Sequence, residues 1–348
     1  MGFIWFWLVA IMLVGYVVLD GFDLGVGVLH LVLARTDAER QMTIRSIGPV
    51  WDGNEVWLLA GGGTLYFAFP LLYASAFSGF YLPLMIVLWL LILRGISIEL
   101  RGHSTLGVWR SFFDGMLGLA STLLIIFYGA ALANVIRGVP LGDDSYFFLP
   151  LWTNWVVGPN PGILDWYTVI GGVVALVALT IHGALYLVIK TEGALQERAR
   201  KTVNTLWGIL ALVTIVSLAA TIYVRPSSLH NYYALPVLFL VPVLVAACLG
   251  GILYFNRTGK EKSAFLCCGG YLAFMMVGAV AGLYPVVLPS ITNANLDITI
   301  DKALSGPHTL QVGLVWWGLG MLMAAGYFIF MYRMFRGKVD LKSTGYGH

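Results

Sequence analysis

Residues 19–27 read LDGFDLGVG and lie within the long apolar segment 3–34. A hydrocarbon core about 30 Å thick is crossed by roughly 20 apolar residues of helix, so this segment is predicted to span a membrane. Asp20 and Asp23 are three positions apart and therefore share one face of that helix. An aspartate near the centre of a spanning helix costs roughly 2.5–3.5 kcal/mol. This face is therefore predicted to lie against protein and not against lipid.

Two interpretations of the paired aspartates are open. Gly21 and Gly25 are four positions apart, the small-residue spacing that lets a second helix approach closely and shield the acids. In the first interpretation, an arginine or backbone donors pair with a buried Asp and fix the register of the helices. In the second, two buried acids without a cation keep one carboxyl protonated at neutral pH, which is the condition for relaying a proton.

The composition is that of an integral membrane protein. The chain of 348 residues is 59% hydrophobic and 11% charged, with a mean hydropathy of +0.86, so it has too few polar residues to cover a water-soluble fold. We predict an all-α, polytopic protein with one membrane domain over residues 1–348 and no nucleic-acid binding. The nine predicted spans are 3–34, 50–73, 76–97, 112–136, 163–189, 203–224, 233–255, 263–288 and 310–332.

The basic residues predict the orientation of these spans. All but three of the 20 Lys and Arg residues lie in one set of alternate loops or at the span ends beside them, the exceptions being Arg137, Arg225 and Lys302. By the positive-inside rule that set is cytoplasmic. The N-terminus is then predicted outside and, because the number of spans is odd, the C-terminus is predicted in the cytoplasm.

Further charged residues lie at the same predicted depth. The stretch WDGNEVW at residues 51–57 places Asp52 and Glu55 near the start of the second span, and Asp114 begins the fourth. Acids in a first helical turn can simply offset the helix macrodipole. Their shared position in the cytoplasmic half instead favours a proton entry. Arg94, near the inner end of the third span, either neutralises one of these acids or extends its charge to the membrane surface.

The histidines and tryptophans give weaker signals. His30 and His182 fall in the cytoplasmic half of the first and fifth spans, the matched depth that two axial ligands of a b-type haem require. A single His on an apolar helix is more often a hydrogen-bonded structural residue. Trp57 is a candidate for contact with a cofactor, although aromatic side chains are common throughout membrane bundles. No pattern of metal-ion ligands is found.

The two polar stretches, followed by AFSGFY at residues 76–81, closely resemble cytochrome bd oxidase subunit II. The order and spacing also fit at Arg94 and at Trp109-Arg110 with Asp114, so the resemblance covers nearly the whole chain. It implies two four-helix bundles plus one peripheral helix. It also implies a pseudosymmetric pairing with a subunit I of similar architecture in a bacterial cytoplasmic membrane.

In that family, subunit I holds two b haems and one d haem, oxidises quinol at the outer face and reduces oxygen to water with cytoplasmic protons. The resemblance therefore implies a chain without a catalytic centre of its own, which supports assembly and can contribute proton or oxygen access. Asp52 is the first candidate for proton entry, with Asp20, Asp23 and Glu55 next and with Arg94 and Asp114 as supporting charges. The quinol is either ubiquinol or menaquinol, and a bound quinone and small single-span accessory subunits are compatible with the resemblance.

Variation within the family argues against an essential role for two of these residues. Some members of the family have Gln at the position of Glu55, and some lack a His at the position of His182. Two other functions are open from the residues alone: a proton-coupled membrane transporter, which also uses buried carboxylates, and a self-sufficient b-type cytochrome. Purification with or without a haem-bearing partner distinguishes them.

Overall fold

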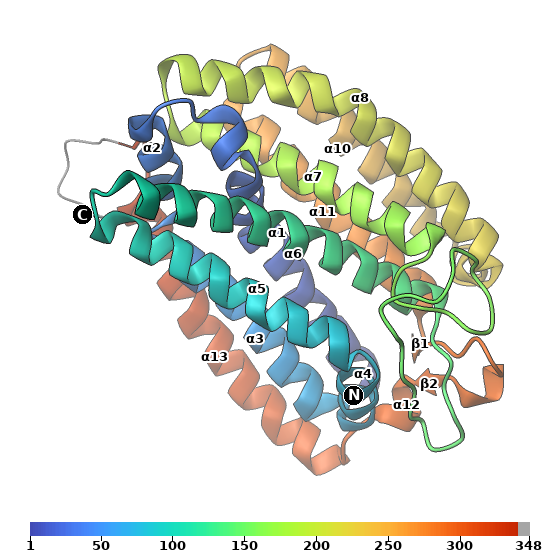
Figure 1. Cartoon of the computed structure of the whole chain (residues 1–348). Helices are drawn as coiled ribbons and strands as arrows, with labels where there is room; N and C mark the ends of the chain where they lie inside the picture. The colour runs from blue at the N-terminus through green and yellow to red at the C-terminus, as the bar shows by residue number, and fades with distance from the viewer. Residues whose placement is uncertain (340–348) are drawn as a thin grey trace.

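The structure is a computed structural model that describes residues 1–339, and it is almost entirely helical (Figure 1). Eight helices in this part of the chain are long and apolar enough to cross a membrane, which confirms the prediction of an all-α polytopic membrane protein. They are α1 (Gly2–Leu33), α5 (Tyr81–Leu100), α6 (Gly107–Arg137), α7 (Trp166–Lys190), α8 (Gly193–Val224), α10 (Leu240–Arg257), α11 (Glu261–Leu283) and α13 (Pro307–Met334).

The predicted span 50–73 differs from the structure. It is divided into α3 (Trp51–Ala68) and α4 (Pro70–Gly79), with a break at Phe69, and α3 is not among the eight helices. Pro70 has no N–H to continue the ladder and disfavours helical geometry at the residue before it, but it suits the first turn of a new helix. Because α4 occupies residues up to Gly79, the next span begins at Tyr81 instead of at residue 76.

The predicted spans 233–255 and 263–288 also differ. Within the first, the residues before 240 lie in and between the short helices α9 (His230–Ala234) and η3 (Pro236–Phe239). The long helix α10 begins only at Leu240. The second ends at Leu283, because Pro285 cannot donate to a helical ladder. The chain then forms β1 (Val286–Leu288), which pairs antiparallel with β2 (Ile298–Thr299), with Val286 opposite Thr299 and Leu288 opposite Ile298.

The remaining elements are short. They are α2 (Asp37–Ile47), η1 (Arg101–His103), η2 (Pro226–Leu229), η4 (Ala294–Leu296) and α12 (Ile300–Ala303). Helix α2 begins with a capping box in which the Thr36 hydroxyl accepts from the Glu39 backbone N–H and the Glu39 carboxylate accepts from the Thr36 backbone N–H. This cap directs the chain back toward the bundle immediately after α1.

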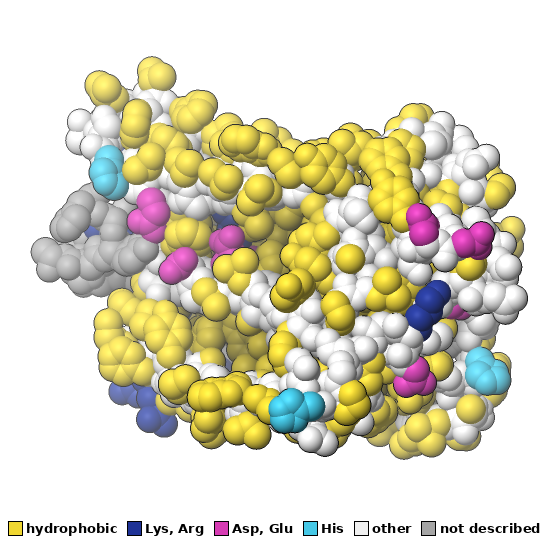
Figure 2. Space-filling model, turned by 90° about the horizontal axis from the view of Figure 1, so that it is seen from below, with side chains coloured by type: hydrophobic (Ala, Val, Ile, Leu, Met, Phe, Trp, Pro, Cys, Tyr) yellow, Lys and Arg dark blue, Asp and Glu magenta, His cyan; other side chains and the backbone are white. Residues whose placement is uncertain are grey.

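Helix α1 is the centre of the bundle and packs against α3, α6, α7 and α11. Helices α1, α3, α5 and α6 lie on one side, α7, α8, α10 and α11 on the other, and α13 lies outside along α3 (Figure 1). This is the expected pair of four-helix bundles with a peripheral helix. Figure 2 shows a largely hydrophobic face whose charged side chains gather near its two ends, as a membrane-crossing protein requires.

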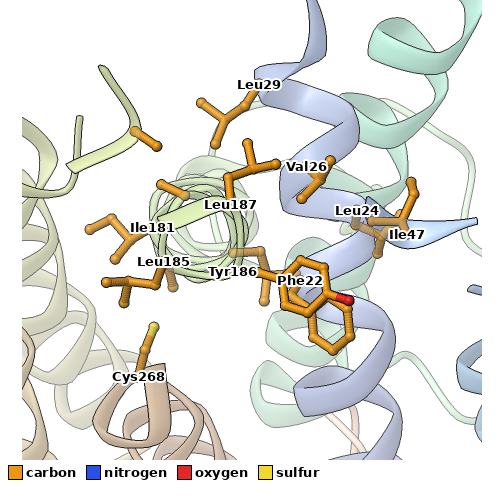
Figure 3. Packing of buried hydrophobic residues seen from close by; sticks show 14 of the residues in the cluster. Phe22, Leu24, Val26, Leu29, Ile47, Ile181, Leu185, Tyr186, Leu187 and Cys268 are labelled. Carbon is orange, nitrogen blue, oxygen red and sulfur yellow. The ribbon is translucent and has the colours of Figure 1, made fainter. Parts of the chain in front are cut away.

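The two bundles meet most closely where α1 crosses α7. A Cβ added to Gly25 would lie 2.0 Å from the backbone oxygen of Leu179, and one added to Gly183 would lie 2.3 Å from the carbonyl carbon of Gly25. Neither position can therefore hold a larger residue without separating the helices. Around the crossing, Phe22 stacks on Tyr186, with ring centroids 4.1 Å apart (Figure 3). This close packing holds the polar residues of α1 away from lipid.

Candidate functional site

Asp20 and Arg94 form an ion pair in the interior of the first bundle. Both side chains are fully buried. Arg94 Nη1 donates to Asp20 Oδ2 at 2.9 Å, and Nη2 donates to Asp20 Oδ1, so the guanidinium holds both carboxylate oxygens. The same guanidinium lies 5.9 Å from the centre of the Trp51 ring. Arg94 therefore neutralises Asp20 and joins α5 to α1, and it does not extend to the membrane surface.

Among residues 1–339, no cation is paired with Asp23 in this way. Its Oδ2 accepts a hydrogen bond of 2.7 Å from Asn54 Nδ2, while its Oδ1 is buried and has no hydrogen-bond partner in the described structure. Asn54 is held by two further bonds, because Nδ2 also donates to Leu19 O at 3.2 Å and Oδ1 accepts from the Tyr332 hydroxyl at 2.9 Å. The two aspartates of one helix face thus have different environments, one paired with a cation and one with an amide.

Asn54 and Tyr332 were missed by the sequence reasoning. Asn54 lies between the two acids of the stretch WDGNEVW, and a buried amide beside conspicuous carboxylates is the signal that could have found it. Tyr332 lies near the end of α13, remote in sequence, and nothing in the pattern around it indicates a contact with Asn54. Only the docking of the peripheral helix along α3 brings its hydroxyl to this position.

Asp52 and Glu55 lie at the N-terminal end of α3, between the surface and this ion pair. Asp52 is exposed in the first turn of the helix, where it also offsets the macrodipole. Glu55 is one turn further in, its side chain 22% exposed, and its Oε2 lies 3.8 Å from Arg94 Nη1. That oxygen is buried without a hydrogen-bond partner in the part of the chain that the structure describes. The first two turns of α3 therefore place one carboxylate at the surface and a second one beside the buried pair.

Asp114 belongs to a second, separate cluster. It lies on the third turn of α6, which begins at Gly107, and not in a first turn as predicted. The buried carboxylate accepts from Arg101 Nε, lies 3.1 Å from Arg40 Nη1 and pairs with His30 Nε2 at 2.7 Å. These bonds join α1, α2, η1 and α6. The five acids that share one depth are therefore divided between two sites.

The two histidines do not fit a haem between them. His30 uses both ring nitrogens, Nδ1 with the Thr43 hydroxyl at 2.6 Å and Nε2 with Asp114, so neither is free to bind iron. His182 Nε2 lies 2.9 Å from Val18 O and its ring stacks on Phe265, with centroids 4.6 Å apart. Its Nδ1 faces this packed interior without a partner within residues 1–339. Paired axial ligation needs a free ring nitrogen on each histidine, and the bonds of His30 to Thr43 and Asp114 do not favour it.

Trp57 is also used inside the chain. Its ring lies 5.7 Å from that of Phe328, centroid to centroid, and fills the space beside Gly15, where an added Cβ would lie 2.5 Å from the indole. The side chain therefore packs between α1 and α13. This position explains why Gly15 is small, and it assigns the indole to helix packing.

Comparisons with known proteins agree with the resemblance. The family model described as cytochrome bd terminal oxidase subunit II matches residues 1–335. The "Cytochrome bd-I ubiquinol oxidase subunit 2" of Escherichia coli is 33% identical, covering 89% of this chain and 87% of that protein. The "Cytochrome bd ubiquinol oxidase subunit 2" of Bacillus subtilis is 30% identical, covering 97% of each.

Two further similarities extend over nearly the whole chain. The "Probable cytochrome oxidase subunit 2" of Haemophilus influenzae is 31% identical, covering 97% of this chain and 95% of that protein. A chain in the solved structure of bd oxidase from Geobacillus thermodenitrificans superposes with a TM-score of 0.77 at 18% identity, covering 96% of this chain and 98% of that one. At this identity the structural match shows a shared fold.

Proposed function

The chain belongs to the cytochrome bd terminal oxidase subunit II family, and on this basis we propose that it works in a quinol oxidase beside a haem-bearing subunit I. The full-length similarity to proteins named as subunit 2 of such oxidases supports this role. In the proposal, subunit I holds the two b haems and the d haem and carries out quinol oxidation and oxygen reduction. This chain contributes assembly contacts and a route for protons.

The proton route begins at the start of α3. Its main support is Glu55 Oε2, a buried carboxylate oxygen with no hydrogen-bond partner in residues 1–339, placed between exposed Asp52 and the interior. Asp52 exchanges protons with water at the membrane surface, and Glu55 accepts them one turn further in. Asp23, whose Oδ1 is also without a described partner, is the next buried acceptor. Asp20 is a less suitable relay because Arg94 occupies both its oxygens.

The assembly role and the orientation have separate support. The Asp20–Arg94 pair and the His30–Asp114 pair join helices that are distant in sequence, which suits a chain that presents a rigid surface to a partner. The concentration of Lys and Arg residues in one set of loops supports a cytoplasmic C-terminus and an outer N-terminus in the bacterial cytoplasmic membrane.

Purification of the chain from its native membrane tests the proposed function. We expect a haem-bearing subunit to purify with it, and the complex to consume oxygen when quinol is supplied. A chain that purifies alone with stoichiometric haem would instead be a self-sufficient cytochrome. A chain that transports a solute in vesicles without any haem protein would be a transporter, and either result would overturn the proposal.

Asp52→Asn is expected to slow quinol-dependent oxygen uptake by about tenfold or more, equivalent to ~1.4 kcal/mol in the barrier. The amide has the same shape but cannot accept and release a proton. The matched control is Asp143→Asn, which changes an exposed acid in the loop 138–165. Oxygen uptake and haem content are measured together, and a full rate at normal haem content would exclude Asp52 from the route.

His182→Gln is expected to leave the haem content of the complex unchanged, because the ring is committed to Val18 O and to stacking on Phe265. The reduced-minus-oxidised absorbance spectrum of the purified complex measures this directly. His308→Gln, at an exposed histidine, is the control. Loss of one b haem in a complex that still contains both subunits would contradict the assignment of all haems to the partner.

A further inference from the structure

A pocket of about 520 Å³ lies at the end of the bundle remote from the Asp20–Arg94 pair. It is formed where α6 and α8 end, together with the loop that contains Pro159 and the segment that contains Ser290. Two arginines line it, Arg137 and Arg225. This end of the molecule carries three basic residues in the sequence, so two of the three line one pocket.

Arg225 is the cation of this pocket without a close partner. Its side chain forms no hydrogen bond or ion pair with the described residues, and its Nε is buried. A guanidinium has five N–H donors. Burial lowers the pKa of Arg225, and the negative charge of Asp297 offsets only part of that decrease. Asp297 Oδ1 accepts a hydrogen bond of 2.6 Å from the Ser290 backbone N–H. Arg225 thus offers an incompletely compensated charge and a full set of donors.

Arg137 also lines the pocket, but its guanidinium is bonded to other residues of the chain. Its guanidinium pairs with the buried Asp165, which neutralises it. It also donates to Asn134 Oδ1 at 2.7 Å, Gly162 O at 3.2 Å and Gly138 O at 3.3 Å. These four bonds leave at most one of its N–H donors for a ligand. The position of Arg137 is therefore fixed by the protein, whereas Arg225 beside it is available.

The surface next to the pocket is apolar. Helix α8 exposes large hydrophobic side chains along the length that leads to Arg225, among them Leu212 at 62%, Ile215 at 67% and Tyr223 at 79%. Ser227 and Ser290 line the pocket itself. The Ser290 hydroxyl is bonded to the Thr292 hydroxyl at 2.8 Å, so Ser227 is the residue that offers a hydroxyl to a ligand. A cationic pocket with a hydroxyl group, placed at the end of an apolar exposed helix face, matches a molecule with a phosphate head and hydrocarbon tails. Guanidinium groups bind phosphate oxygens with two parallel hydrogen bonds.

We propose that this pocket binds the phosphate group of a phospholipid, with Arg225 as the principal ligand and the acyl chains along α8. A free phosphate ion shares the head-group chemistry but gains nothing from the apolar helix face. The lipid would lie between the ends of α6 and α8 and the segment around Ser290. Spanning helices end near the level of the lipid head groups, and the pocket lies where α6 and α8 end, so it is at the depth of the lipid phosphates.

The test uses the complex purified in mild detergent with its partner. Native mass spectrometry, together with phospholipid analysis of an extract, counts the lipids that stay bound. Arg225→Gln is expected to lose one phospholipid per complex, or to retain it about tenfold less well, because charge-assisted hydrogen bonds are removed. Lys302→Gln, at an exposed basic residue of the same end, is the matched control and should retain the lipid.

Two further measurements distinguish the outcomes. Dioleoylphosphatidylethanolamine added to the delipidated wild-type complex should restore the lost mass, whereas inorganic phosphate alone should not remain bound through detergent washing. If Arg225→Gln does not assemble, Arg225→Lys keeps the charge without the two-pronged geometry and should show weakened retention. Equal lipid retention in wild type and an Arg225 variant overturns the proposal, as does stable binding of inorganic phosphate with no lipid.

Discussion

Arg94→Leu is expected to reduce the amount of assembled, folded chain by roughly a hundredfold or more. Breaking a buried ion pair by removing one partner costs about 3–5 kcal/mol, because the other charge is left buried and unpaired. Both Asp20 and Arg94 are fully buried, and the guanidinium holds both oxygens of the carboxylate. The measurements are the quantity of chain in the membrane and the thermal stability of the purified complex.

The double variant Asp20→Leu, Arg94→Leu provides the control. Replacing a whole buried ion pair by apolar side chains of similar size is often neutral or stabilising, so the double variant should recover most of the assembled complex. Its rate of oxygen uptake then reports whether Asp20 also takes part in proton transfer. Wild-type stability of Arg94→Leu, or an equally large loss in the double variant, would contradict the account of the pair as a charge-compensated clasp.

Gly183→Val is expected to prevent close contact of the two bundles and to destabilise the chain by more than ~3 kcal/mol. Overfilling a packed core already costs about 1–3 kcal/mol where side chains can adjust. Here the added Cβ would meet backbone atoms, 2.3 Å from the carbonyl carbon of Gly25 and 2.4 Å from the backbone nitrogen of Val26. Relief requires separation of α7 from α1, which thermal unfolding of the complex detects.

The control is Gly208→Ala in α8, where no atom of the described part of the chain lies within 4 Å of an added Cβ. Alanine favours a helix by about 1 kcal/mol over glycine, so this variant should be as stable as wild type or slightly more so. Gly183→Ala should be clearly less stable than Gly208→Ala. Equal stability of these two alanine variants would show that the crossing of α1 and α7 tolerates a side chain.

The membrane class and the family could be predicted from local sequence. Long apolar helices such as α1 need only length and hydropathy, and the stretches at residues 19–27 and 51–57 carry the resemblance. Three of the errors in helix bounds occur at Pro70, Pro236 and Pro285, where a missing N–H interrupts an otherwise continuous apolar run. Hydropathy alone does not report that interruption, although the prolines were visible.

The sequence predicted which residues form the candidate site, but not which of them form ion pairs and hydrogen bonds with one another. Asp20 and Asp23 have the same residue type, depth and helix face, yet only Asp20 receives Arg94, which is 74 positions away in the chain. Asp114, at the same depth, is held instead by His30 and Arg101. Nothing local to these residues distinguishes their partners.

The sequence by itself determined that this protein lies in a membrane, that its acids must be sheltered there, and which family it resembles. These properties follow from the transfer of each residue between water and lipid and from short motifs, which are local. Only the tertiary structure decided which acid is paired with a cation, which has an oxygen without a partner among residues 1–339, and that both ring nitrogens of His30 are bonded within the chain. Those outcomes depend on how helices rotate and approach one another, and the glycines at the α1–α7 crossing set that approach.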